Sequence, residues 1–254
     1  MEAGRQSKFK IGAIIQARMK SVRLPGKVLM PLPFDTKTPL LFWPISRLKT
    51  SKLINQIVLA TSIQPENEPL KKLAKDMDID FYAGDEDNVL KRFVEVIEKY
   101  NLDIVIRLTG DNPLIDISLV EHLIQIHITT NSDYTYSVNL PIGMNIELFN
   151  SDCLLSLKAN SNLTKDDKEH VTLYLKESGK FKVLLYSFPG IQPREDIRLT
   201  IDYAADYAML NIVMQICHFK KIYGMKLVSY IDTHYPWLWK INNMHLQKRR
   251  FSSL

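Results

Sequence analysis

A positively charged loop that directly follows a short apolar run constrains this chain more than any other feature. The apolar run, Ile11–Ile15, predicts a buried first strand. Residues 18–27 then read RMKSVRLPGK, and the Pro-Gly pair inside them predicts a constrained turn. Sheets of the α/β class bind phosphates on loops placed like this one. The sequence therefore predicts a polyphosphate site near its N-terminal end.

The rest of the sequence alternates between strand-like and helix-like segments. This alternation predicts an α/β fold, a mostly parallel sheet with helices on both faces. We expect strands at residues 11–15, 57–60, 80–83, 103–108, 134–138, 146–149, 182–188 and 197–201. We expect helices at residues 39–49, where Pro44 should cause a kink, and at 70–75, 88–100, 118–128 with Ser118 as its N-cap, 152–158, 165–177 and 204–219.

The length and composition favour one ordinary domain and exclude several classes of protein. At 254 residues we expect a single domain, residues 11–247, between a flexible leader, residues 1–10, and a basic tail, residues 248–254. The formal net charge is +5, but no aromatic-rich RNA-binding signature is present, so we expect no nucleic-acid partner. No apolar run approaches the roughly 20 residues of a membrane span, and no signal peptide is recognisable. Cys153 and Cys217 lie too far apart for a zinc motif or a disulfide framework. We expect a cytoplasmic protein with no membrane partner.

Two aspartates follow strand-like runs at distant points of the sequence. Asp111 lies in RLTGDNPLID, residues 107–116, where Gly110 and Pro113 end the strand. Asp202 ends the run at 197–201, just before a helix. If both lie at the carboxyl edge of one sheet, they form the pair of carboxylates that Mg²⁺ bound to a triphosphate prefers. The alternatives are an ordinary turn residue for Asp111 and a helix N-cap for Asp202.

The loop at residues 18–27 matches neither the P-loop nor the dinucleotide-binding motif. It resembles the R-x-x-S-x-R-L-P-G-K loop of the cytidylyltransferases that make CMP-activated acidic sugars. RLTGDNPLID resembles their GD-x-P-L motif, and RLTIDYAADY, residues 198–207, resembles their R-x-T-x-D-x-x-x-D segment. The three motifs keep the family order over about residues 11–210, and the chain looks closest to the SpsF-like spore coat polysaccharide and acylneuraminate cytidylyltransferase group. The resemblance implies a three-layer, Rossmann-like fold of the nucleotide-diphospho-sugar transferase type, with a strand-rich insertion.

The resemblance also implies roles for individual residues. Arg18 and Lys27 would hold the triphosphate, and Asp111 and Asp202 would bind Mg²⁺, so these four are the expected catalytic residues. Relatives that make CMP-3-deoxy-manno-octulosonate carry Gln at the position of Thr109, where it helps to read cytosine. The further expected nucleotide-binding residues are Ala17, Ser21, Arg23, Gly26, Thr61, Thr109 and Gly110.

The stretch at residues 133–190 resembles the acceptor-binding part of the same family. GMNIE, residues 143–147, looks like a GxDxE strand, and KEHVT, residues 168–172, looks like an REHVT segment. Glu147 and His170 are therefore expected to line the acceptor pocket, and Arg194 to neutralise a substrate carboxylate. The alternatives are a satisfied helix-face histidine and a surface salt bridge. Because related synthetases dimerise through this region, we also expect a homodimer, with Tyr134 and Tyr136 suited to the interface. A strand with one buried face is the alternative explanation for these two tyrosines.

Together the motifs imply a Mg²⁺-dependent enzyme that joins CTP to an acidic sugar and releases pyrophosphate. The expected acceptor is a 3-deoxy-ulosonic or nonulosonic acid, used in the biosynthesis of a surface polysaccharide such as that of the spore coat. Two other functions remain open. One is a nucleotide-sugar-dependent glycosyltransferase, which would use the D-x-D sequence at Asp76–Asp80. The other is a non-catalytic nucleotide-binding module.

Overall fold

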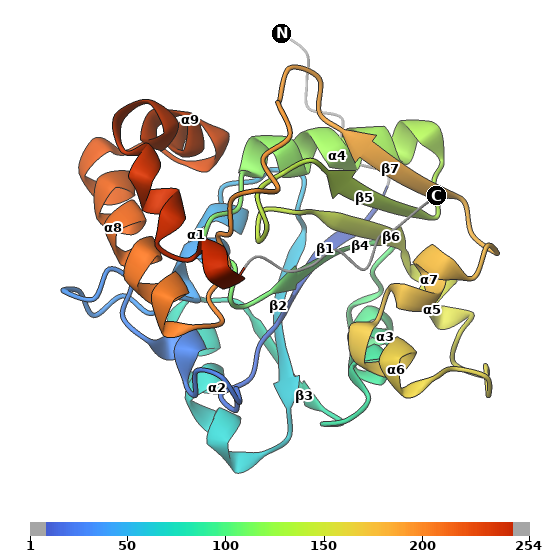
Figure 1. The fold of residues 1–254 in the computed structure, drawn as a ribbon. Coiled ribbons are helices and arrows are strands. Elements are labelled where there is room, and N and C mark those ends of the chain that lie inside the picture. The colour runs from blue at the N-terminus through green and yellow to red at the C-terminus, as the bar shows by residue number, and fades with distance from the viewer. Residues whose placement is uncertain (1–8, 246–254) are drawn as a thin grey trace, which may run out of the picture.

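The computed structural model describes residues 9–245, and its core is one seven-stranded sheet (Figure 1). The spatial order of the strands is β3-β2-β1-β4-β6-β5-β7. Seven of the eight expected strands are therefore present near the expected positions. Their bounds are β1 Ile11–Gln16, β2 Gln56–Ser62, β3 Asp80–Gly84, β4 Ile104–Thr109, β5 Tyr134–Val138, β6 Glu147–Asn150 and β7 Val183–Ser187.

The pairing of the strands decides which loops meet. Strands β3, β2, β1 and β4 are parallel, so their carboxyl ends lie at one edge of the sheet. Strand β6 runs antiparallel to β4, and its first residue, Glu147, pairs with Arg107 near the end of β4. The loops after β1, β2 and β4 and the start of β6 therefore open at the same edge, where open α/β sheets bind ligands.

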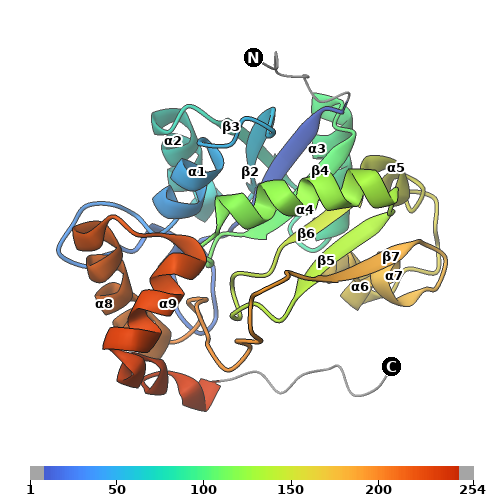
Figure 2. The same ribbon diagram turned by 90° about the horizontal axis from the view of Figure 1, so that it is seen from above.

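Helices cover both faces of the sheet and complete three layers. Side chains of α1, α2, α4, α8 and α9 join one buried apolar cluster, and those of α3, α5 and α7 join a second cluster on the other face. Figure 2 shows α4 on one side of the sheet and α3 on the other, with α8 and α9 together at one end. This architecture confirms the expected fold class. The helix bounds are α1 Phe42–Leu48, α2 Glu68–Asp76, α3 Val89–Tyr100, α4 Ile117–Thr130, α5 Ser151–Leu155, α6 Lys165–His170, α7 Leu173–Glu177, α8 Ala204–Lys220 and α9 Gly224–His234.

The strand expected at residues 197–201 is wrong. This segment makes a single bridge, between Ile142 and Arg198, and its next hydrogen bond goes from Ile201 N to Asp111 O at 3.0 Å. Gly143, with φ of 96°, turns the neighbouring chain away after that bridge. The segment therefore lies against the loop after β4 and leads into α8, and it does not extend the sheet.

Several expected helix ends are also corrected. Asp116, and not Ser118, is the N-cap of α4, because its carboxylate accepts from the backbone N–H groups of Ser118 and Leu119. The helix expected at 39–49 begins only at Phe42. Pro44 lies in its first turn, where a missing N–H breaks no helical bond, so the reason to expect a kink is removed.

The helix expected at 165–177 is two helices. Val171 has φ of 58° and breaks the segment into α6 and α7. Helix α9 is an element that the sequence reasoning missed. Cys153 and Cys217 are buried and unpaired, in keeping with the expected lack of a disulfide.

The remaining expectations concern the ends of the chain and the membrane. The basic tail at 248–254 and most of the leader at 1–10 lie outside the described residues. Within residues 9–245, none of the helices has the length and apolar character needed to cross a membrane.

Replacing Gly143 with alanine should disturb the segment that carries Asp202. A Cβ atom there would lie 2.8 Å from the backbone of both Leu199 and Thr200. We expect Gly143→Ala to lose more stability than Gly190→Ala by at least about 1 kcal/mol, a typical cost of overpacking. Gly190 is a matched control, because its φ is also positive at 79° but nothing lies within 4 Å of its Cβ position. Urea unfolding of both variants measures the difference, and equal losses would contradict this role of Gly143.

Candidate active site

The basic loop between β1 and α1 folds back on itself at the carboxyl edge. Gly26 adopts φ of 71°, and its N–H donates to Met19 O at 2.8 Å. The side chain of Asn67, at the start of α2, accepts from Met19 N at 2.9 Å. A positive φ favours glycine, so the Pro-Gly pair in the sequence explains the turn. The turn directs Lys27 back toward the sheet.

Lys27 joins the two aspartates that the sequence analysis singled out. Its Nζ atom lies 2.7 Å from Asp111 Oδ2 and 2.9 Å from Asp202 Oδ1, and it also donates to Ile201 O at 2.7 Å. The lysine and Asp202 are buried, with 9% and 8% of their side chains exposed, whereas Asp111 keeps 22%. The two carboxylates therefore converge on one point, as expected, although they are ninety-one residues apart in sequence.

Two arginines complete the surroundings of Asp202. Arg23 Nη2 lies 2.6 Å from Oδ1, and the buried Arg198 donates to Oδ2 at 2.5 Å. Burial raises the pKa of Asp202, but the hydrogen bond and charge of Lys27, with help from both arginines, outweigh burial and hold it below its ordinary value. Asp202 is thus ionised and ion-paired. It is not the N-cap of α8, because Tyr203 occupies that position.

Asp206 holds this group in place from the first turn of α8. It is completely buried and accepts from the backbone N–H groups of Asp202 and Tyr203, both at 2.9 Å. It also accepts from Arg198 Nε at 3.1 Å. The sequence reasoning missed Arg198 and Asp206 as site residues. Both belong to the R-x-T-x-D-x-x-x-D segment, so their signal was present in the sequence.

The other expected nucleotide-binding residues lie around the same edge. The backbone N–H of Gly110 donates to Gln16 O at 2.8 Å. A Cβ atom on Gly110 would lie only 2.8 Å from the Cβ atom of Ala17, so the absence of a side chain allows the ends of β1 and β4 to approach closely. Thr61 is buried at the end of β2, and its hydroxyl has no hydrogen-bond partner in the described part of the chain. Thr109 accepts from the side chain of Asn112 at 2.9 Å.

The side chains of the loop itself differ in how much they are engaged. Arg18 is exposed and Ser21 half-buried, and neither side chain has a hydrogen bond or ion pair among residues 9–245. Arg23 is bound to Asp202, and its guanidinium also lies 4.9 Å from the ring centre of Tyr203. Within residues 9–245, Arg18 is therefore the one cation of the loop without an acidic partner, whereas aspartates bind Arg23 and Lys27 and Glu66 binds Lys20.

The expected acceptor residues are not gathered in the same way. Glu147 accepts from Arg107 Nη1 at 2.8 Å and from Thr172 Oγ1 at 3.0 Å, so it lies near the carboxyl end of β4. His170 ends α6 with an exposed side chain that makes no hydrogen bond in the described residues. The sequence reasoning missed Arg107 and Thr172, although Thr172 belongs to the quoted KEHVT segment.

Arg194 has a structural role that the sequence reasoning held open. Its guanidinium pairs with Asp196 and with Asp232 of α9. It thereby ties the chain before residue 197 to a helix at the end of the molecule. Its charge is neutralised twice by these aspartates, and its part in binding a substrate carboxylate stays a prediction.

The donor set at Asp111 and Asp202 fits a magnesium ion in part. Two carboxylate oxygens that converge on one cation are the hard donors that Mg²⁺ takes alongside phosphate oxygens. Asp111 is partly exposed and binds one ammonium group. Asp202 already accepts from three cationic side chains, so a metal can bind it only if Arg23 or Lys27 turns to another anion.

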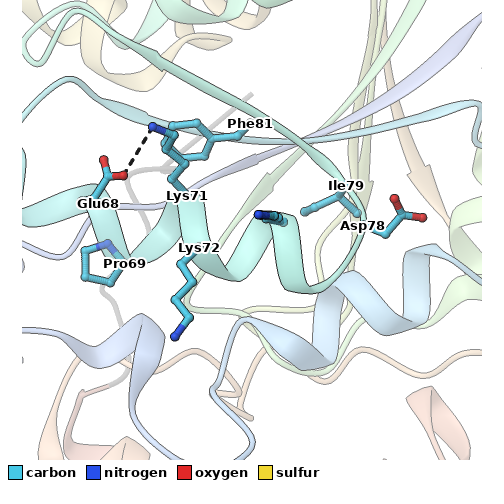
Figure 3. A pocket seen from close by; sticks show the side chains of 8 residues that line it. Glu68, Pro69, Lys71, Lys72, Asp78, Ile79 and Phe81 are labelled. Carbon is cyan, nitrogen blue, oxygen red and sulfur yellow. Dashed lines mark ion pairs between the residues drawn. The ribbon is translucent and has the colours of Figure 1, made fainter.

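An open cavity of about 960 Å³ lies elsewhere, over α2 and β3 (Figure 3). Lysines of α2, Phe81 and Asp78 line it, and none of them is an expected site residue. Asp78 belongs to the D-x-D sequence that a glycosyltransferase would use. That sequence leads into the amino end of β3, whereas the predicted site lies at the carboxyl edge, so the geometry disfavours this alternative.

Comparisons with known proteins show the family of this chain. The family model described as cytidylyltransferase matches residues 12–230. This chain belongs to the cytidylyltransferase family. SpsF, a spore coat polysaccharide biosynthesis protein of Bacillus subtilis, is 36% identical over 207 residues, which cover 80% of this chain and 85% of SpsF. The expected family is thereby confirmed, and this cytidylyltransferase is a nucleotidyltransferase enzyme.

Solved structures support the same conclusion. A cytidylyltransferase from Leptospira borgpetersenii superposes with a TM-score of 0.82 at 27% identity, covering 96% of this chain and all of the other. A CMP:2-keto-3-deoxy-manno-octonic acid synthetase, solved with CTP, superposes with a TM-score of 0.63 over 81% of this chain and 98% of its own. At 18% identity the second match supports the fold alone.

Removing the charge of Asp202 should destabilise the protein in a pH-dependent way. Asp202→Asn leaves Lys27 and Arg198 short of a buried partner, which typically costs about 3–5 kcal/mol at pH 7. The folded state lowers the pKa of Asp202 below its ordinary value of 3.8. The ionised carboxylate therefore contributes its full stabilisation above pH 3.8, and this stabilisation is lost as the pH falls through the lowered pKa of the folded state. Urea unfolding of wild type and variant between pH 3 and pH 7 measures this difference.

Asp196→Asn is the matched control, because Asp196 pairs with Arg194 but is 64% exposed. We expect it to cost less than about 1 kcal/mol with little pH dependence. A loss in Asp202→Asn that is no larger than in this control would contradict the account of the buried group.

Proposed function

We propose that this cytidylyltransferase transfers CMP from CTP to a hydroxyl group of an acidic sugar and releases pyrophosphate. The observation that carries the proposal is the convergence of Asp111 and Asp202 on Lys27, at the edge where the basic loop opens. The sugar oxygen attacks the α-phosphorus, and the bond from that phosphorus to the β-phosphate oxygen breaks. Such a transfer needs positioning and charge neutralisation more than a protein nucleophile.

The basic loop would hold the triphosphate. Arg18, Arg23 and Lys27 would donate to its oxygens, and the backbone near Ser21 and Gly26 would add N–H donors. If phosphate oxygens bound Arg23 and Lys27 in place of Asp202, the Oδ1 atom of Asp202 would be available to a metal ion. Asp111 and Asp202 would then hold Mg²⁺, which when bound supplies charge neutralisation on the triphosphate and the reacting hydroxyl. Ala17, Thr61, Thr109 and Gly110 would surround the nucleoside.

The acceptor would lie against β6 and the α6–α7 segment. Glu147 is fixed there by Arg107 and Thr172, and His170 is exposed and free to meet a ligand. A 3-deoxy-ulosonic or nonulosonic acid is the proposed acceptor class. SpsF of Bacillus subtilis is named for spore coat polysaccharide biosynthesis, so a surface polysaccharide is the proposed destination, with the reaction in the cytoplasm.

The same region supports the proposed homodimer. Strand β7 is an edge strand of the sheet, and Leu185 on it is 49% exposed. Edge strands with exposed apolar side chains are suited to pairing with a second copy. Tyr134 cannot contribute, because it is completely buried. The interface would therefore consist of β7 and its neighbours within residues 133–190, and light scattering at micromolar concentration would test it.

The proposed activity is tested by measuring pyrophosphate release from the four nucleoside triphosphates against a panel of acidic sugars, with Mg²⁺ or with EDTA. We expect release from CTP with at least one 3-deoxy-ulosonic or nonulosonic acid, and only with Mg²⁺. A preference for UTP or ATP would contradict the nucleotide assignment, and release in EDTA would contradict the metal.

Removing the charge of Arg18 should weaken that activity without unfolding the protein. A hydrogen bond to a charged group contributes about 1.5–3 kcal/mol, so Arg18→Gln should lower kcat/KM for CTP about tenfold to a hundredfold. Its thermal stability should not fall, because Arg18 is exposed and its side chain makes no hydrogen bond or ion pair in the described residues. Lys20→Gln is the matched control on the same loop, since the Lys20 side chain is 77% exposed and its one ion pair in the described residues is with Glu66. Equal activity in the two variants would contradict the role of Arg18.

A further inference from the structure

Arg92 is a buried arginine in the first turn of α3, just beyond the carboxyl end of β3. Only 3% of its surface is exposed. Its stem passes over Gly84, where a Cβ atom would lie 2.9 Å from Arg92 Cγ. The glycine that ends β3 therefore makes room for this side chain, which lies at the same edge of the sheet as the basic loop.

The guanidinium of Arg92 has no ionic partner in the described residues. Nη1 donates to the backbone oxygen of Asp85 at 3.0 Å, and this is its one hydrogen bond there. Nε is enclosed and unpaired. Nη2 also makes no hydrogen bond, but unlike Nε it is not fully enclosed. A buried cation without an ion pair is costly, and arginines at such positions are normally paired.

The neighbouring carboxylates are bound to other groups. Asp85 Oδ1 accepts from the N–H groups of Asp87 and Asn88, both at 3.0 Å, and Oδ2 lies 3.9 Å from Lys91 Nζ. The side chain of Glu86 accepts from Gln64. Neither acid therefore reaches Arg92 with a direct ion pair.

The positive charge of Arg18 also acts on Arg92. Burial lowers the pKa of Arg92, the positive charge of Arg18 lowers it further, and Asp85 and Glu86 oppose this to a smaller extent. Arg18 itself has no partner in the described residues and belongs to the basic loop. The two arginines come from segments that follow β1 and β3, at the same edge of the sheet. Neither has an acidic partner in the described residues, and their mutual repulsion is unfavourable unless an anion binds there.

We propose that Arg92 is an anion-binding residue and that, together with Arg18, it receives a phosphate group of the nucleotide substrate or of the leaving pyrophosphate. The inference rests on the proposed function for the identity of the anion. Arginine presents a planar fork of donors that matches two phosphate oxygens, and the enclosed position makes such a contact stronger than one at the surface. Arg92 would therefore extend the triphosphate site beyond the loop at residues 18–27, toward the start of α3.

Direct binding to the full chain tests this proposal. Isothermal titration calorimetry with pyrophosphate, CTP, CMP and cytidine compares wild type with Arg92→Met and Arg92→Gln. Methionine keeps the apolar stem, and glutamine keeps a donor for the oxygen of Asp85. We expect either variant to bind pyrophosphate and CTP at least tenfold more weakly, with cytidine binding within twofold of wild type. A loss that includes CMP assigns the contact to the α-phosphate, and a loss that spares CMP assigns it to the β- and γ-phosphates.

Arg47→Met is the matched control. Arg47 lies on α1 with an equally enclosed and unpaired Nε, and its guanidinium stacks 4.4 Å from the ring centre of Tyr223, outside the proposed site. It should leave pyrophosphate binding unchanged. Thermal unfolding without ligand provides the second readout. Arg92→Met should not lower Tm, because it removes an unpaired buried charge, whereas a purely structural arginine would lower it.

Three results would overturn the proposal. The first is pyrophosphate and CTP binding within twofold of wild type in both Arg92 variants. The second is an equal loss in Arg47→Met. The third is failure of both Arg92 variants to fold, which would make Arg92 a structural residue. The proposed function can fail separately: if wild type releases no pyrophosphate from CTP with any acidic sugar, the binding comparison still decides the role of Arg92.

Discussion

One ammonium group, Nζ of Lys27, holds two carboxylates from distant parts of the chain. The loop after β1 brings the lysine, the end of β4 brings Asp111, and the segment before α8 brings Asp202. Buried ion pairs are seldom the most stable way to fill such a space, because desolvation offsets much of their attraction. The arrangement is therefore better explained by what it can bind than by what it adds to stability.

The charges around this point are balanced in the protein alone. Arg23, Lys27 and Arg198 face Asp111, Asp202 and Asp206, three cations against three carboxylates. Arg198 and Asp206 are the most enclosed and act as a fixed support, since their bonds also position the backbone at Asp202. Arg23 and Lys27 come from the loop and can exchange one anion for another. If a triphosphate and its metal bound here, phosphate oxygens would neutralise Arg23 and Lys27. The metal would in turn neutralise Asp111 and Asp202.

Much of this could be predicted from the sequence, for physical reasons. Strand β1 is a short apolar run, and β4 is an apolar run that Gly110 and Pro113 end. Because the Pro-Gly turn lies just before Lys27, the loop and Asp111 could be assigned to the correct edge. The convergence with Asp202 could be inferred only from resemblance, because residue spacing does not encode a crossing of ninety-one residues. The β-rich run at 197–201 predicts a strand, and Gly143 with its turn explains why pairing stops after one bridge.

Other features depend on contacts that a sequence pattern does not carry. The helix that carries Arg92 has an amphipathic pattern, and this pattern gives no sign that the guanidinium is buried without an acidic partner in the described residues. Arg194 was expected to meet a substrate, but its partners include Asp232 on α9, a helix that the sequence reasoning did not anticipate. The motif residues were thus the most predictable part of the site, and the residues that support them were the least.

The central claim is that phosphate oxygens of a bound triphosphate pair with Arg23 and Lys27, so that Asp111 and Asp202 can bind a metal ion. A crystal structure of the full chain with CTP and Mg²⁺ tests it most directly. The account predicts Arg23 and Lys27 on phosphate oxygens and one Mg²⁺ ion held by both Asp111 and Asp202. Bound CTP with the Lys27–Asp202 and Arg23–Asp202 contacts unchanged, and with the metal on neither aspartate, would contradict it.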